Sequence, residues 1–133
     1  MARILIADDE RSVLLLTQRL LNANGYETAE AANGLAALEL FQNQFFDLII
    51  TDLRMPRMDG MTFLHEVNKL EPTIPIIILT AYASTENSAE TIKNRTSVHM
   101  AKPFIADELL NTVKCMLGTG TKPTDTPMDV KTT

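Results

Sequence analysis

The chain has 133 residues, of which 45% are hydrophobic and 22% are charged, and its formal net charge is −5. This length and composition are typical of one soluble globular domain and exclude a chain that is disordered throughout. The acidic balance argues against direct nucleic-acid binding, the apolar runs are too short to span a membrane, and the single cysteine excludes an intramolecular disulfide.

The N-terminus leads directly into charged residues at Asp8 and Asp9, without the apolar segment of a signal peptide, so we expect a cytoplasmic protein. From there, five short apolar runs alternate with five stretches of helical spacing. We expect strands at the runs, which cover residues 4–7, 27–31, 48–51, 76–79 and 98–101. Three of the runs are rich in Ile, Val and Leu, which is typical of strands buried on both faces of a parallel sheet. The weakest run, 27–31, is expected at an edge. This alternation predicts a doubly wound α/β fold with right-handed crossovers.

The stretches between the runs place apolar residues on one helical face. The predicted core stripes are Val13, Leu16 and Leu20, widened by Leu14 and Leu21; Leu35, Leu38 and Phe41; Leu64, Val67 and Leu70; Leu109, Val113 and Met116. Candidate helix starts are Ser12, Asn33, Asp59 and Thr62, and candidate stops are Gly25 and Gly118. The fourth stretch, 84–94, has few apolar residues, so we expect a loosely held helix there.

Polar side chains stand where the predicted strands end. Asp8 and Asp9 follow the first strand, Asp52 follows the third, Thr80 ends the fourth and Lys102 follows the fifth. In an open α/β sheet, ligands bind at the carboxyl ends of the strands, so these side chains should converge. Three carboxylates favour a hard divalent cation such as Mg²⁺, and Lys102 suits a phosphoryl oxygen. The set predicts a phosphoryl-transfer site with a carboxylate nucleophile.

The same residues carry a family resemblance. The matching motifs are DDE at 8–10, DLRMPRMDG at 52–60, LTA at 79–81 and AKPF at 101–104. In this order and spacing they resemble the receiver domain of bacterial two-component response regulators, and LTAYAS looks similar to the enhancer-binding type. The resemblance covers residues 1–117 and implies a flavodoxin-like five-stranded parallel sheet of order 2-1-3-4-5 with five helices. Residues 118–133 lack apolar periodicity and are expected to form a flexible tail or linker stub.

The resemblance also implies roles at the predicted site. Asp52 would be the phosphoacceptor, and a sensor histidine kinase or a phosphotransfer protein would be the donor. Asp9 and Asp52 would bind Mg²⁺ directly, Asp8 would bind it through water, and the carbonyl of Arg54 would complete the ligands. Such a domain is not an enzyme that turns over a metabolite; it assists its own phosphorylation and dephosphorylation.

Other positions would transmit or time the signal. Thr80 and His99, which stands at the family's aromatic position, would form the switch. The output face would comprise helix 84–94, the last strand and the last helix, and would meet a downstream effector or a second copy of the chain. Arg54 and Tyr82 would flank the path of the hydrolytic water and set the phosphoryl lifetime.

Two other functions remain open. One is a phosphorylation-independent pseudo-receiver that serves only as an interaction module. The other is a Mg²⁺-dependent phosphatase, which usually needs a second carboxylate two residues after the first, where this chain has Arg54. The acidic turn after the first strand would repel a nucleotide phosphate, so a dinucleotide or FMN site there is not expected. Ile105 stands where the family has an acidic helix cap, and Ile cannot cap.

Overall fold

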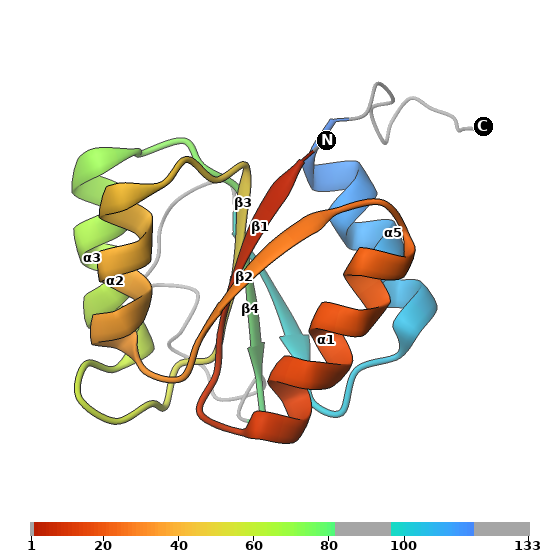
Figure 1. Ribbon diagram of the computed structural model, residues 1–133, viewed down its shortest axis with the longest axis horizontal. Helices are drawn as coiled ribbons and strands as arrows, with labels where there is room; N and C mark the ends of the chain where they lie inside the picture. The colour runs from red at the N-terminus through yellow and green to blue at the C-terminus, as the bar shows by residue number, and fades with distance from the viewer. Residues whose placement is uncertain (1, 82–96, 119–133) are drawn as a thin grey trace. The chain divides into compact units, whose positions relative to one another are not determined.

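Five parallel strands form one sheet in the computed structural model, which describes residues 2–81 and 97–118. The strands are β1 (Arg3–Ala7), β2 (Glu27–Ala31), β3 (Leu48–Thr51), β4 (Ile76–Thr80) and β5 (Ser97–Ala101). Their order is β2-β1-β3-β4-β5, and all neighbours are parallel (Figure 1). The predicted strand order, the strand limits to within a residue and the edge position of β2 are confirmed.

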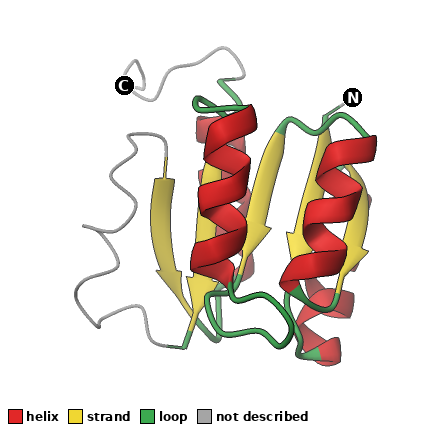
Figure 2. Ribbon diagram, turned by 90° about the vertical axis from the view of Figure 1, so that its left-hand side faces the viewer, coloured by secondary structure: helices red, strands yellow, loops and turns green. Residues whose placement is uncertain are grey.

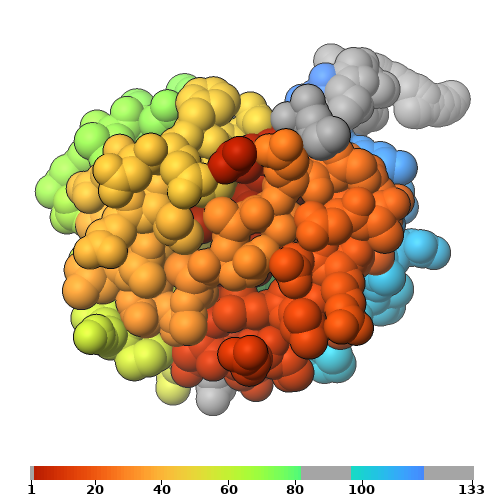
Figure 3. Space-filling model, viewed as in Figure 1, coloured from red at the N-terminus to blue at the C-terminus, as the bar shows by residue number. Residues whose placement is uncertain are grey.

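Burial explains why these runs become strands. Every residue of β3 and β4 is buried, as are the last four of β1, so both faces of the sheet's centre are covered. β2 reads ETAEA and buries only Ala31 fully, which suits an edge. Figure 3 shows this edge with the side chains of α1 and α2 on either side of it.

Four helices lie within the described residues: α1 (Arg11–Ala23), α2 (Gly34–Asn43), α3 (Gly60–Leu70) and α5 (Ala106–Met116). α2 and α3 lie side by side on one face of the sheet, and α1 covers the opposite face (Figures 1 and 2). The core beneath α2 and α3 contains Phe41, Phe63 and Val67 against Ile49 and Ile78. No helix in the described ranges is long and apolar enough to cross a membrane.

The chain divides into two compact units, Met1–Pro103 and Phe104–Thr133. The first contains the whole sheet and α1 to α3; the described part of the second contains α5, which buries Leu109 and Val113. The expected fourth helix, 84–94, and the tail after Gly118 lie outside the described residues.

Helix ends match the sequence signals in part. Asn33 and Asp59 cap α2 and α3, and Gly25 follows α1 with a φ of +90°, as its role as a stop signal requires. Ser12 is wrong as a start, because α1 begins at Arg11 after Glu10. Thr62 is wrong too, because its backbone N–H donates to the capping side chain of Asp59 at 2.9 Å, inside the helix. Ile105 precedes α5 and makes no side-chain cap, as predicted.

One predicted core stripe is wrong in part, since its member Leu21 is buried but Leu16 is not. In α1 the inward face is centred on Thr17 and Leu21, which are fully buried, whereas Leu16 is 58% exposed. Two stripe positions near helix ends, Leu35 and Leu70, are exposed as well. Among the stripe residues of α2 and α3, those that meet the core are Leu38, Phe41, Leu64 and Val67.

Candidate functional site

The strand register places the predicted site residues at one edge of the sheet. Ala7 of β1 pairs with Thr51 of β3, so Asp8 and Asp52 each follow a residue of the same pair. Since β4 lies next to β3, its last residue, Thr80, ends at the same edge. β4 also pairs with β5, and the backbone N–H of Lys102 donates to the carbonyl of Thr80 at 3.2 Å. The predicted convergence of distant residues is therefore present in the fold.

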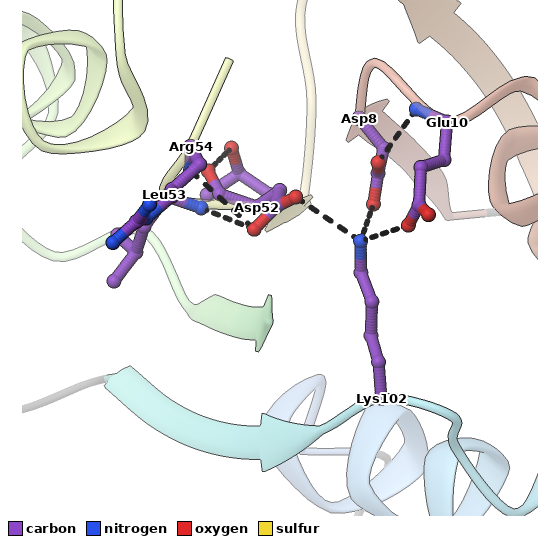
Figure 4. A network of polar contacts seen from close by, with 7 residues as sticks. Asp8, Glu10, Asp52, Leu53, Arg54 and Lys102 are labelled. Carbon is purple, nitrogen blue, oxygen red and sulfur yellow. Dashed lines mark hydrogen bonds and ion pairs between the residues drawn. The ribbon is translucent and has the colours of Figure 1, made fainter. Parts of the chain in front are cut away.

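Three carboxylates form an acidic cluster at this edge. Asp8, Asp9 and Asp52 each offer one oxygen, and these oxygens lie within 4.8 Å of one another. Asp8 and Asp52 are buried, and Asp9 is exposed. One oxygen of Asp52 accepts the backbone N–H of Leu53 at 2.7 Å and, more weakly, that of Arg54 at 3.5 Å (Figure 4). The nucleophile candidate is thus held by its own loop.

Burial and crowding shape the electrostatics of Asp8. Burial raises its pKa, and the nearby Asp52 raises it further, while the N–H of Glu10 and the Lys102 ammonium act in the opposite direction. A cation would relieve this repulsion. The donors are hard oxygens that converge on one point and are partly open to solvent through Asp9, so they fit Mg²⁺.

Lys102 is the counter-ion of the cluster. Its Nζ lies 3.0 Å from Asp8, 3.0 Å from Asp52 and 2.7 Å from Glu10. Burial by itself lowers the pKa of Lys102, but the hydrogen bonds to Glu10, Asp8 and Asp52 outweigh it and raise the pKa well above its usual value. Lys102 is therefore charged at any physiological pH, and its ammonium contacts one carboxylate oxygen of Asp52.

The loop after β3 and the start of α3 pack closely against the backbone of Asp52. A Cβ on Gly60 would overlap the carbonyl oxygen of Asp52 and lie 2.7 Å from the Cα of Leu53. The N–H of Gly60 donates to the carbonyl of Leu53 at 2.8 Å. Gly60, which we interpreted from the sequence as a tight-turn residue, is required by this close approach of α3 to the strand end.

The same loop contains a strained turn. The N–H of Met58 donates to the carbonyl of Pro56 at 2.7 Å, and Arg57 between them has a φ of +69°. This is a γ-turn with its middle residue in a conformation that L side chains rarely adopt. Nothing in the sequence pattern predicted it.

The predicted switch and timing residues have different placements. Thr80 is fully buried at the end of β4, and the Arg54 side chain is exposed beside the site. His99 is partly buried in β5 opposite Ile78, and its buried Nε2 has no hydrogen-bond partner among the described residues. Burial lowers the pKa of His99. Tyr82 lies outside the described residues.

Glu10 is a site residue that sequence reasoning missed. The sequence pattern assigns it to the acidic turn and the DDE motif but gives it no role, yet its carboxylate makes the shortest of the three contacts to Lys102. A weak signal was available, because Glu is a poor residue for the N-cap position that it occupies on α1.

Known proteins share the sequence of this chain in part. The sequence model of the response regulator receiver domain matches residues 4–114. The chain is 39% identical over 125 residues to the transcriptional regulatory protein ZraR of Escherichia coli (strain K12), covering 93% of this chain but 28% of ZraR. It is 37% identical to the sporulation initiation phosphotransferase F of Bacillus subtilis (strain 168), covering 84% of this chain and 90% of that protein.

Solved structures show the same fold. The response regulator TrrA of Thermotoga maritima, in complex with Mg²⁺ and BeF, superposes with a TM-score of 0.79 at 36% identity. The match covers 87% of this chain and 99% of TrrA. The chain thus spans less than a third of ZraR but nearly all of these shorter proteins.

Proposed function

Because this chain belongs to the response regulator receiver domain family, we propose that it accepts a phosphoryl group on Asp52. The donor is the phosphohistidine of a sensor histidine kinase or of a phosphotransfer protein, in the cytoplasm. One observation carries the proposal: the buried carboxylate of Asp52 lies 3.0 Å from the Lys102 ammonium and within 4.8 Å of two further carboxylates.

The chemistry is an in-line displacement. A carboxylate oxygen of Asp52 attacks phosphorus, the bond from phosphorus to the histidine nitrogen breaks, and the imidazole leaves with its electron pair. The product is an acyl phosphate. Lys102 stabilises the negative charge on the transferring oxygens because it is already held beside Asp52, and the Thr80 hydroxyl donates a hydrogen bond to the same group.

A metal ion completes the site. Asp9 and Asp52 would bind Mg²⁺ directly, Asp8 would bind it through a water molecule, and the carbonyl of Arg54 would be a further ligand. Mg²⁺ supplies charge neutralisation at the phosphoryl oxygens. Burial and, to a smaller extent, the nearby charge of Asp52 raise the pKa of Asp8, and this supports the assignment because a bound cation would favour the ionised carboxylates.

The acyl phosphate is then hydrolysed by water, and the domain assists that step too. We assign Arg54 and Tyr82 to the entrance of the water path, and the exposed Arg54 side chain beside Asp52 supports the first of these. Bulky side chains at both positions would exclude or misplace the water, so replacing both residues by Ala should speed phosphoryl loss, measured by intact mass after the donor is removed. An unchanged rate would contradict this role.

Phosphorylation would be read on the face made by residues 84–94, β5 and α5. Thr80 turns toward the phosphoryl group, and His99 turns inward behind it. A downstream effector or a second copy of the chain then binds this face. The receiver domain would extend over residues 1–117, with residues 118–133 as a tail or linker stub. This is a switch that assists its own modification and turns over no free metabolite.

The direct test is the site of labelling. Incubation with acetyl phosphate and Mg²⁺ should add one phosphoryl group, seen by intact mass, and Asp52→Asn should abolish it. Asp59→Asn is the matched control, since it removes one loop carboxylate while Asn still caps α3. Equal labelling of wild type and Asp52→Asn would refute the assignment, and no labelling of the wild type by any donor would favour the pseudo-receiver.

A further inference from the structure

Glu10 closes a ring of three residues beside the proposed phosphoacceptor. Its backbone N–H donates to one oxygen of Asp8 at 2.9 Å, and its side-chain carboxylate accepts from Nζ of Lys102 at 2.7 Å. Nζ of Lys102 in turn contacts the other oxygen of Asp8 at 3.0 Å (Figure 4). The ring therefore ties the start of α1 to a residue 92 positions along the chain.

The side chain of Glu10 is committed to Lys102 rather than to its own helix. Glu10 is the N-cap residue of α1, but its side chain makes no capping hydrogen bond. A residue that capped the first turn would normally be Ser, Thr, Asp or Asn. A long acidic side chain at this position can instead reach across the site, which is what the 2.7 Å contact shows.

The ammonium has no spare hydrogen in this state. A Lys ammonium has three N–H donors, and three carboxylates surround Nζ at hydrogen-bonding distance, those of Asp8, Glu10 and Asp52. A phosphoryl oxygen can therefore bind Lys102 only when one of the three acceptors gives up its place. The question is which of them does so at the smallest cost.

Exposure answers that question. The side chains of Asp8 and Asp52 are 3% and 8% exposed, whereas that of Glu10 is 56% exposed. Asp8 is also held by the N–H of Glu10, and Asp52 is held by the N–H of Leu53. Water can solvate the Glu10 carboxylate as soon as it leaves, so it is the acceptor that is displaced most easily.

Resting on the proposed function, we infer that Glu10 is a positioning residue that competes with the phosphoryl group for Lys102. In the unphosphorylated protein its carboxylate holds the ammonium in the three-way contact. On phosphorylation it is displaced, and Lys102 turns one N–H toward the phosphoryl oxygen. The strength of the Glu10–Lys102 contact thereby limits how readily the domain enters the phosphorylated state.

The test measures binding of beryllofluoride, a phosphoryl mimic, to the full chain by backbone amide shifts at saturating Mg²⁺. Glu10→Gln should bind beryllofluoride about 1.5- to five-fold more tightly, the range expected for loss of one partly exposed charge contact. Glu39→Gln, which neutralises an exposed carboxylate on α2, should bind like the wild type. Glu10→Asp keeps the charge but shortens the side chain, so it should also bind more tightly than the wild type.

A second readout needs no phosphoryl mimic. In the metal-free protein, the Lys102 ammonium resonances should shift in Glu10→Gln and Glu10→Asp but not in Glu39→Gln. Unchanged or weaker beryllofluoride binding by Glu10→Gln would overturn the inference while the proposed function stood. Wild type that binds no beryllofluoride would overturn the proposed function itself. Tighter beryllofluoride binding by Glu10→Gln without tighter binding by Glu10→Asp would also refute competition through the contact. The long-range charge of Glu10 would then explain the effect of Glu10→Gln.

Discussion

Replacing Lys102 by Met should destabilise the metal-free protein and strengthen its response to Mg²⁺. The Lys102 side chain is 10% exposed and is the cation that Asp8 and Asp52 contact at 3.0 Å. Without it, two buried carboxylates lose their counter-ion, and removing one partner of a buried ion pair typically costs about 3–5 kcal/mol. Because both carboxylates keep a backbone N–H donor, we expect the lower end, about 3 kcal/mol in free energy of unfolding.

Mg²⁺ should reverse much of that loss. Lys102 competes with a cation for the same oxygens, so its removal should leave Mg²⁺ affinity unchanged or higher. A ligand at 100 times its Kd stabilises the folded state by about 2.7 kcal/mol, which is close to the expected deficit. Chelator-treated Lys102→Met should therefore be much less stable than wild type, and at high Mg²⁺ the gap should narrow.

Urea unfolding followed by circular dichroism, with chelator and over a series of Mg²⁺ concentrations, measures both effects. Lys69→Met is the matched control, because Lys69 forms an exposed ion pair with Glu66 at 3.3 Å, and such pairs contribute at most about 1 kcal/mol. Lys102→Met as stable as wild type in chelator would refute the counter-ion role. Loss of Mg²⁺ affinity would show that Lys102 supports the metal site.

Two further predictions concern the proposed switch residue His99 and the close packing of Gly60 against Asp52. Burial lowers the pKa of His99 below 6.5, so protonation favours the unfolded state: this stabilising contribution is complete above about pH 6.5 and is lost as the pH falls through the folded-state pKa. The unfolding free energy of wild type should fall between pH 6.5 and 5, and His99→Phe should reduce that fall. His65→Gln, at an exposed position, should leave it unchanged. If His99→Phe and wild type show the same pH dependence, His99 is not the cause of the fall. Gly60→Ala should lower stability by about 2 kcal/mol or more through overlap with the Asp52 carbonyl, and weaken beryllofluoride binding. Gly25→Ala is the control: the φ of +90° at this position strains an Ala, but a Cβ there would meet open space, so it should lower stability without altering that binding. If both variants changed beryllofluoride binding to a similar extent, the packing of Gly60 against Asp52 would not be the cause.

Which residues form the site was predictable, because the order and direction of the strands determine it. Parallel strands end at the same edge, so polar residues directly after buried runs converge whatever their separation in sequence. Asp8, Asp52 and Lys102 satisfy that rule, and their ion pairs follow from it. The strand order needed the family resemblance as well, since alternation of strands and helices alone does not choose among doubly wound orders.

Details that depend on side-chain reach or on close packing were not predictable. Residues 13–16 read Val-Leu-Leu-Leu, and with four consecutive apolar residues the helical period cannot identify the inward face, which is set by Thr17 and Leu21. The contact of Glu10 depends on where a residue 92 positions away is placed. The need for Gly60 arises from the path of another backbone segment, which no local signal in the sequence records.

The acidic border of the sheet at β2 bears on how the protein behaves in concentrated solution. Glu27 and Glu30 are both exposed on this strand, and Glu27 is paired with Arg3 at 3.0 Å. Two molecules that tried to extend their sheets by joining β2 to β2 would bring like charges together and would have to dehydrate them. β2 thus disfavours extension of the sheet at its own edge, in a sheet whose central strands include apolar sequences such as Ile-Ile-Ile-Leu-Thr in β4.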